Sequence, residues 1–152
     1  MTTREIVRIM VNQFWKQVTP GMLERARVLQ LSTQEFVTLA SLSGKETGYR
    51  DEKALVSGVF HNRLKKGMRL QSDPTAIYNL RNYSSKVTRR HLDNESPYNT
   101  YKIKGLPPGP IANPGIDSLR AALYPASVNY LYFVSNNDGT HRFSMNLIAH
   151  NE

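Results

Sequence analysis

Thr33-Gln-Glu-Phe-Val-Thr-Leu-Ala-Ser-Leu-Ser-Gly-Lys-Glu-Thr47 is the stretch around which the rest of the chain is organised. Its apolar residues recur at helical spacing, so we expect a helix over residues 33–47. At about 100° per residue, Glu46 lies about 20° from Leu39 and about 40° from Leu42, on the stripe that should face the core. Burial of a carboxylate costs free energy unless partners compensate for the lost hydration, so its presence on this face suggests a function. Glu46 is therefore the first candidate for a functional acid.

The two ends of this helix carry different signals. Ser32 or Thr33 is a suitable N-cap residue, although Thr33 is not followed by the acid that would complete a capping box. Gly44 and Gly48 flank Glu46, and each glycine costs about 1 kcal/mol relative to alanine if it lies inside the helix. We expect this end of the helix to tolerate close approach by another part of the chain.

Glu46 has two interpretations. It could be an ordinary helical carboxylate that pairs with a nearby base such as Lys45 or Arg50, which is the commoner case for a lone glutamate. It could instead be a general acid, held protonated near neutral pH by an apolar wall that disfavours its charged form. The rest of the chain has to decide between them.

Composition bounds the class of protein. With 152 residues and no long apolar run, we expect one soluble domain over 1–152 that buries roughly 70% of its unfolded surface. The formal charge of +8 favours an anionic partner such as nucleic acid, anionic lipid or an acidic wall polymer. The absence of cysteine excludes disulfides, thiolate metal sites and cysteine nucleophiles. Residues 1–11 alternate charged and apolar side chains, which is typical of neither a signal peptide nor a membrane span.

The order of expected elements predicts an α+β fold, rich in helix at its N-terminal end. Apolar spacing predicts further helices over residues 3–18, 21–30, 51–66, 74–80 and 116–123. The first of these has an apolar stripe of Ile6, Ile9, Met10, Phe14 and Val18. Proline and glycine between residues 96 and 115 indicate long ordered loops. Residues 130–134 and 141–144 should form a β-hairpin, because Asp138-Gly139 supplies the positive φ of a tight turn.

No other side chain competes clearly with Glu46. Asp73, in Leu-Gln-Ser-Asp-Pro-Thr, is either a turn or cap residue for the following helix or a site residue. The remaining acids that we considered fit first helical turns or the hairpin turn, and we expect them to be structural: Asp51, Glu52, Asp117 and Asp138. The spacing of the four histidines does not fit a zinc site, and the commonest hydrolase and nucleotide-binding motifs are missing.

The loops offer a possible carbohydrate site. Tyr98-Asn-Thr-Tyr101 and the stiff segment from Gly105 to Ile111 combine aromatic faces, an amide and backbone donors, which together suit a glycan cleft. The alternative is a packed loop whose tyrosine hydroxyls are satisfied by internal hydrogen bonds. Composition alone favours the packed loop.

Six blocks in this order resemble the YceG-like, or MltG, family of endolytic murein transglycosylases, with a match from about Val37 to Asn151. The blocks are Leu39–Leu42 with Lys45–Thr47, Val59–Leu64, Gly67–Thr75, Tyr98–Tyr101, Gly105–Ile111 and Tyr130–Val134. The resemblance implies a lysozyme-like fold and Glu46 as the catalytic acid, without metal or cofactor. Where the family usually has another glutamate, this chain has Gly44, which bears on rate and pH optimum.

The family's activity gives the expected function. The resemblance implies cleavage of the β-1,4 bond between N-acetylmuramic acid and N-acetylglucosamine in peptidoglycan strands, with formation of 1,6-anhydro ends that terminate nascent strands. The substrate-binding candidates are Gln71, Ser72, Asp73, Tyr98, Asn99, Thr100, Tyr101, Pro107 and Asn113. A catalytically impaired glycan-binding module is the alternative, suggested by Gly44. Dispersed basic residues, not clustered with aromatic rings, argue against a nucleic-acid partner.

The resemblance also bears on location and partners. Full-length family members carry an N-terminal membrane helix and a LysM-like region outside the cytoplasm, so this chain resembles their catalytic domain alone. We therefore expect the full-length protein to act at the extracytoplasmic face of the bacterial cytoplasmic membrane, which it would reach only through segments absent from this chain. Peptidoglycan strands and wall-synthesis proteins are the expected partners.

Overall fold

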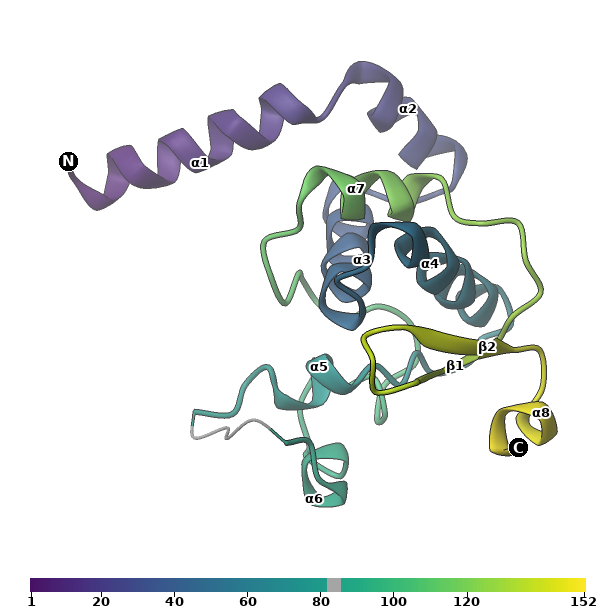
Figure 1. Cartoon of the computed structure of the whole chain (residues 1–152). Coiled ribbons are helices and arrows are strands. Elements are labelled where there is room, and N and C mark those ends of the chain that lie inside the picture. The colour runs from purple at the N-terminus through teal and green to yellow at the C-terminus, as the bar shows by residue number, and fades with distance from the viewer. Residues whose placement is uncertain (82–85) are drawn as a thin grey trace.

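The computed structural model describes residues 1–81 and 86–152 (Figure 1). The helices are α1 (Thr3–Gln17), α2 (Pro20–Val28), α3 (Thr33–Glu46), α4 (Arg50–Lys65), α5 (Asp73–Ile77), α6 (Arg89–Leu92), α7 (Ile116–Leu123) and α8 (Leu147–Asn151). The strands β1 (Tyr132–Ser135) and β2 (His141–Ser144) form a two-stranded antiparallel sheet, with Tyr132 opposite Ser144. The helix-rich α+β prediction is confirmed.

The core surrounds α3, which packs against both α4 and α7 (Figure 1). Leu39 and Leu42 are fully buried, as the stripe that they share with Glu46 predicts. They pack with buried side chains of the two neighbouring helices, including Phe60 and Leu123. Burial of a leucine or phenylalanine side chain stabilises a fold by about 1.5–3 kcal/mol. This packing fixes the direction in which the last turn of α3 presents its carboxylate.

The N-terminal cap of α3 is one of the two residues that the sequence predicted. The cap is Ser32, whose hydroxyl accepts a hydrogen bond from the Glu35 amide (3.1 Å), while the Glu35 carboxylate accepts one from the Ser32 amide (2.7 Å). The capping box is therefore complete, with its cap one residue before Thr33. The helix ends at Glu46, so the acid is the last residue before the chain turns toward α4.

Gly44 allows α3 and α7 to approach closely. A Cβ atom at this position would lie 2.8 Å from the Ser118 hydroxyl oxygen on α7. The expected close approach is confirmed for Gly44, whereas Gly48 lies beyond the helix with no atom that its Cβ would meet. A side chain at position 44 would therefore require the Ser118 hydroxyl to move.

The predicted helix at the N-terminus is confirmed, but only the C-terminal end of its apolar stripe is buried, where Val18 follows α1. Ile6, Ile9 and Met10 are each about half exposed, and only Phe14 of α1 packs against the core. Figure 1 shows that α1 extends away from the other helices. The spacing identified an apolar face correctly, but it did not identify a surface that would cover it. No helix in the described ranges is long and apolar enough to cross a membrane.

The short elements follow the sequence less closely. The helix expected over 74–80 is α5, which is shorter, begins at Asp73 and has Ser72 as its N-cap. Helices α6 and α8 were not predicted, because four or five residues are too few to show a helical period. The hairpin is confirmed, with β1 starting at Tyr132, and Gly139 has the expected positive φ of 91°.

Candidate active site

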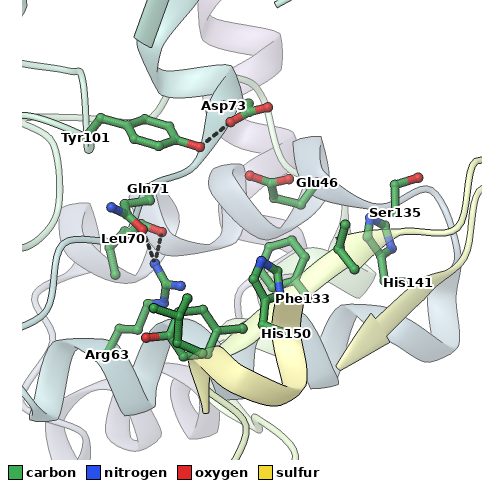
Figure 2. A pocket seen from close by; sticks show the side chains of 13 residues that line it. Glu46, Arg63, Leu70, Gln71, Asp73, Tyr101, Phe133, Ser135, His141 and His150 are labelled. Atoms are coloured by element: carbon green, nitrogen blue, oxygen red, sulfur yellow. Dashed lines mark hydrogen bonds between the residues drawn. The ribbon is translucent and has the colours of Figure 1, made fainter. Parts of the chain in front are cut away.

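A cavity of about 430 Å³ opens at the C-terminal end of α3 (Figure 2). Side chains from α3, α4, the segment before and at the start of α5, a loop, the hairpin and α8 line it. These residues are Glu46, Arg63, Leu70, Gln71, Asp73, Tyr101, Tyr132, Phe133, Val134, Ser135, His141, Leu147 and His150. Elements far apart in sequence therefore build one site around Glu46.

Glu46 is a partly buried acid with a proton available near neutrality. The Ser72 hydroxyl donates a hydrogen bond of 2.5 Å to its Oε1 atom. Burial raises the pKa of Glu46 to about 7; the Ser72 hydrogen bond and the Arg63 charge oppose this rise, and the Asp73 charge adds to it. A carboxyl group in this state can donate a proton and, once ionised, take one back.

Thr100 holds the segment that carries Ser72 against Glu46. Gln71 has a positive φ of 50°, and its amide donates to the Thr100 carbonyl oxygen (3.2 Å). The Ser72 amide donates to the Thr100 hydroxyl oxygen (2.9 Å), and that hydroxyl is also bonded to the hydroxyl of Thr75 (2.7 Å). Because Thr100 and Ser72 are both buried, these bonds hold the Ser72 backbone beside Glu46.

Asp73 lies beside the acid but does not cap α5. The cap is Ser72, and no side-chain hydrogen bond closes the first turn. Instead, Asp73 Oδ1 accepts a hydrogen bond of 2.5 Å from the Tyr101 hydroxyl (Figure 2). Burial and the neighbouring Asp73 raise the pKa of Tyr101, so its phenol keeps the proton that it donates. The interpretation of Asp73 as a cap is therefore wrong.

Arg63 is a buried guanidinium at the base of the cavity. It donates hydrogen bonds to the carbonyl oxygens of Leu131 (2.7 Å), Arg69 (3.0 Å) and Leu70 (3.0 Å), and to the Gln71 side-chain oxygen (3.4 Å). Its carbon Cζ lies 5.1 Å from the centre of the Tyr132 ring, a cation–π distance. Arg63 thereby ties α4 to the hairpin and to the segment before α5.

A second tie joins the hairpin to the chain just after Glu46. The Glu52 carboxylate accepts hydrogen bonds from the His141 amide (2.8 Å) and the Thr47 hydroxyl (3.2 Å), and lies 2.7 Å from His141 Nδ1. The two side chains are only 15% and 9% exposed, respectively. Glu52 belongs to the first turn of α4, as predicted, and also fixes the hairpin wall relative to the catalytic candidate.

The structure gathers some of the predicted substrate-binding residues and separates others. Gln71, Asp73 and Tyr101 line the cavity, and Ser72 contacts Glu46. The remaining candidates lie outside it: Tyr98 packs on Tyr78, Asn99 and Thr100 are buried in hydrogen bonds of the loop, and Pro107 and Asn113 line other surface grooves.

Sequence reasoning missed the wall formed by α4, the hairpin and α8. Arg63, His141 and His150 line the cavity, although none was a candidate. Arg63 carried a usable signal, because it lies only three residues beyond Phe60 on the buried face of α4, where a charged residue needs partners. No group of three or more potential metal ligands occurs among residues 1–81 and 86–152.

The chain belongs to the YceG-like family, whose model matches residues 1–152. It is 38% identical over 148 residues to an endolytic murein transglycosylase of Bacillus subtilis (strain 168), which covers 97% of this chain and 41% of that protein. It is 34% identical over 111 residues to an endolytic murein transglycosylase of Streptococcus pneumoniae serotype 2 (strain D39), with 70% of this chain and 20% of that protein covered.

The fold is similar to a solved structure of the same family. A crystal structure of a YceG-like protein from Listeria monocytogenes matches with a TM-score of 0.90 and 40% sequence identity. The match covers 99% of this chain and 48% of that one. The chain thus spans less than half the length of the relatives that it matches.

Proposed function

We propose that this chain is a lytic transglycosylase domain that cleaves peptidoglycan strands with Glu46 as the acid. The observation that carries the proposal is the position of Glu46, at the end of a buried helix stripe and in a cavity that raises its pKa to about 7. The names of the Bacillus and Streptococcus relatives support murein as the substrate.

The proposed reaction needs only one proton carrier. Glu46 protonates the glycosidic oxygen as the bond between that oxygen and C1 of N-acetylmuramic acid breaks. The 6-hydroxyl of the same sugar then bonds to C1, and its proton passes to the Glu46 carboxylate. No water is consumed, and the acid returns to its starting state. A hydrolytic glycosidase would instead need a second carboxylate to activate water or to form a covalent intermediate.

The positions of Gln71, Asp73 and Tyr101 in the cavity lining support contacts between these residues and the substrate. Ser72 would hold the Glu46 carboxyl in one orientation through the 2.5 Å hydrogen bond. The other predicted substrate-binding residues stay predictions for more distant parts of a long strand. Termination of nascent strands, wall-synthesis partners and a location outside the cytoplasmic membrane also belong to the proposal.

Gly44 does not favour the alternative of an impaired binding module. Its Cα faces Ser118 on α7, and it is not among the residues that line the cavity. A glutamate at this position would have to displace Ser118 before it could influence Glu46. We therefore expect turnover without that carboxylate.

The test is digestion of purified peptidoglycan by the wild-type chain, by Glu46→Gln and by Glu95→Gln, which replaces an exposed acid outside the cavity. We expect fragments with anhydro ends, lighter than hydrolytic products by one water molecule, from the wild type and Glu95→Gln only. Incorporation of heavy oxygen from labelled water would contradict a non-hydrolytic reaction. Binding to strands without any cleavage by the wild type would favour the glycan-binding module.

A further inference from the structure

Asp73 is a second carboxylate in the cavity that contains Glu46. It starts α5 and lines the same cavity as Glu46, and Figure 2 shows both acids on the side of the cavity where Tyr101 enters. The two acids come from different elements, held together by the Ser72–Glu46 hydrogen bond one residue away from Asp73. Its carboxylate therefore has a defined place beside the proposed proton donor.

Within the described residues, the carboxylate of Asp73 has one side-chain partner, the Tyr101 hydroxyl. It does not cap α5, and no ion pair within residues 1–81 and 86–152 involves it. The Tyr101 hydroxyl donates to Oδ1, and Oδ2 has no hydrogen-bond partner among the described residues, while the residue is exposed and lines the cavity. An oriented, unpaired acid in a cleft is a typical arrangement for electrostatic catalysis.

Among the charged or titratable side chains that line the cavity, Asp73 is the carboxylate other than Glu46. The other charged or titratable groups that line the cavity are Arg63, Tyr101, Tyr132, His141 and His150. Arg63 is committed to backbone and amide oxygens, so it cannot neutralise Asp73 without breaking those bonds. The negative charge of Asp73 also raises the pKa of Glu46, which favours the protonated form of Glu46.

We infer that Asp73, oriented by the Tyr101 hydroxyl, is a second catalytic carboxylate that stabilises the positive charge on the sugar ring during bond cleavage. The inference rests on the proposed function. Cleavage spreads positive charge over C1 and the ring oxygen, and a fixed anion is most effective where substrate has displaced water. Asp73 forms no covalent bond and moves no proton, so Glu46 still carries both proton transfers. Tyr101 is a positioning residue.

The experiment compares Asp73→Asn, Tyr101→Phe and the control Asp51→Asn, which changes an exposed acid outside the cavity. Asparagine retains an oxygen that can accept the Tyr101 hydrogen bond, so the variant removes charge with little change of shape. Initial rates on purified glycan strands are measured against substrate concentration and pH. Thermal unfolding verifies that each variant is folded.

We expect Asp73→Asn to lower kcat by about a hundredfold with a small change in KM. The alkaline limb of its pH profile should move to lower pH, because loss of the anion lets Glu46 ionise earlier. Tyr101→Phe should lower kcat by about tenfold, since the charge remains but is no longer fixed. Asp51→Asn should match the wild type.

An Asp73→Asn variant with unchanged kcat and a raised KM would overturn the inference, because Asp73 would then only bind substrate. A lower kcat with an unmoved alkaline limb would also overturn it. In both cases Glu46→Gln would still be inactive. If the wild type forms no anhydro product, the proposed function itself fails, which is a distinguishable result.

Discussion

Replacement of Glu46 with glutamine should stabilise the folded protein at alkaline pH while abolishing activity. In the folded state burial raises the pKa of Glu46 from 4.5 to about 7, so the group favours its protonated form there more than in the unfolded chain. Its contribution to stability is therefore full below 4.5 and is lost as the pH rises through about 7. Glutamine does not titrate, and its side-chain oxygen can still accept the Ser72 hydrogen bond.

The magnitude follows from that pKa difference. A tenfold change in an acid dissociation constant is about 1.4 kcal/mol, so full ionisation of Glu46 costs up to about 3 kcal/mol in folding free energy. Water that enters through the cavity reduces this cost, and we expect a gain of about 2–3 kcal/mol for Glu46→Gln at about pH 9. For a chain of this size the gain is a rise in Tm of roughly 4–12 °C. At about pH 5 the gain should fall below about 1 kcal/mol.

The assay is urea or thermal denaturation of the wild type, Glu46→Gln and the exposed-site control Glu95→Gln at both pH values. Subtracting the gain at about pH 5 from that at about pH 9 removes any pH-independent effect of the substitution. A gain of equal size at both pH values would refute the reasoning, since it could not come from ionisation. A loss of stability at about pH 9 would show that the cavity favours the charged acid.

Three further changes test the supports of the site. In the wild type the Ser72 hydrogen bond lowers the pKa of Glu46, so Ser72→Ala should raise this pKa. The alkaline limb of the pH–rate profile should then move to higher pH, and kcat should fall by about tenfold. Glu52→Gln should lower unfolding free energy by about 1–3 kcal/mol near neutrality. Burial raises the pKa of Glu52, but the hydrogen bonds from His141 lower it more, so the pKa lies below its ordinary value. The stability that Glu52 contributes is therefore lost as the pH falls, and the difference between Glu52→Gln and the wild type should become smaller in acid. Gly44→Glu should destabilise the protein by about 1–3 kcal/mol in urea titrations, because the new side chain would meet Ser118. A second change, Ser118→Gly, should recover part of this stability. Higher activity from Gly44→Glu alone would contradict our expectation that position 44 affects packing and not Glu46.

Local patterns predicted most of the secondary structure and the central acid. The period of α3 places Glu46 on the buried stripe, and the limits of α7 agree with the sequence at both ends. The Asp-Gly turn predicted the hairpin. These features depend on residues within a few positions of one another, where helical geometry and backbone preferences act directly. The treatment of residues 1–152 as one domain stays a prediction.

Only the tertiary structure decided which of these elements meet. The apolar stripe of α1 had the pattern of a core face, but Ile6, Ile9 and Met10 are each about half exposed. The sequence favoured Asp73 as a helix cap, but in the structure its carboxylate accepts a hydrogen bond from Tyr101, which lies in a loop distant in sequence. His141 joined the site because Glu52, far earlier in the chain, holds it. The periodicity of apolar residues determines which face of a helix or strand a residue occupies. Contacts between elements distant in sequence depend on how whole elements pack, and local sequence patterns contain no information on that packing.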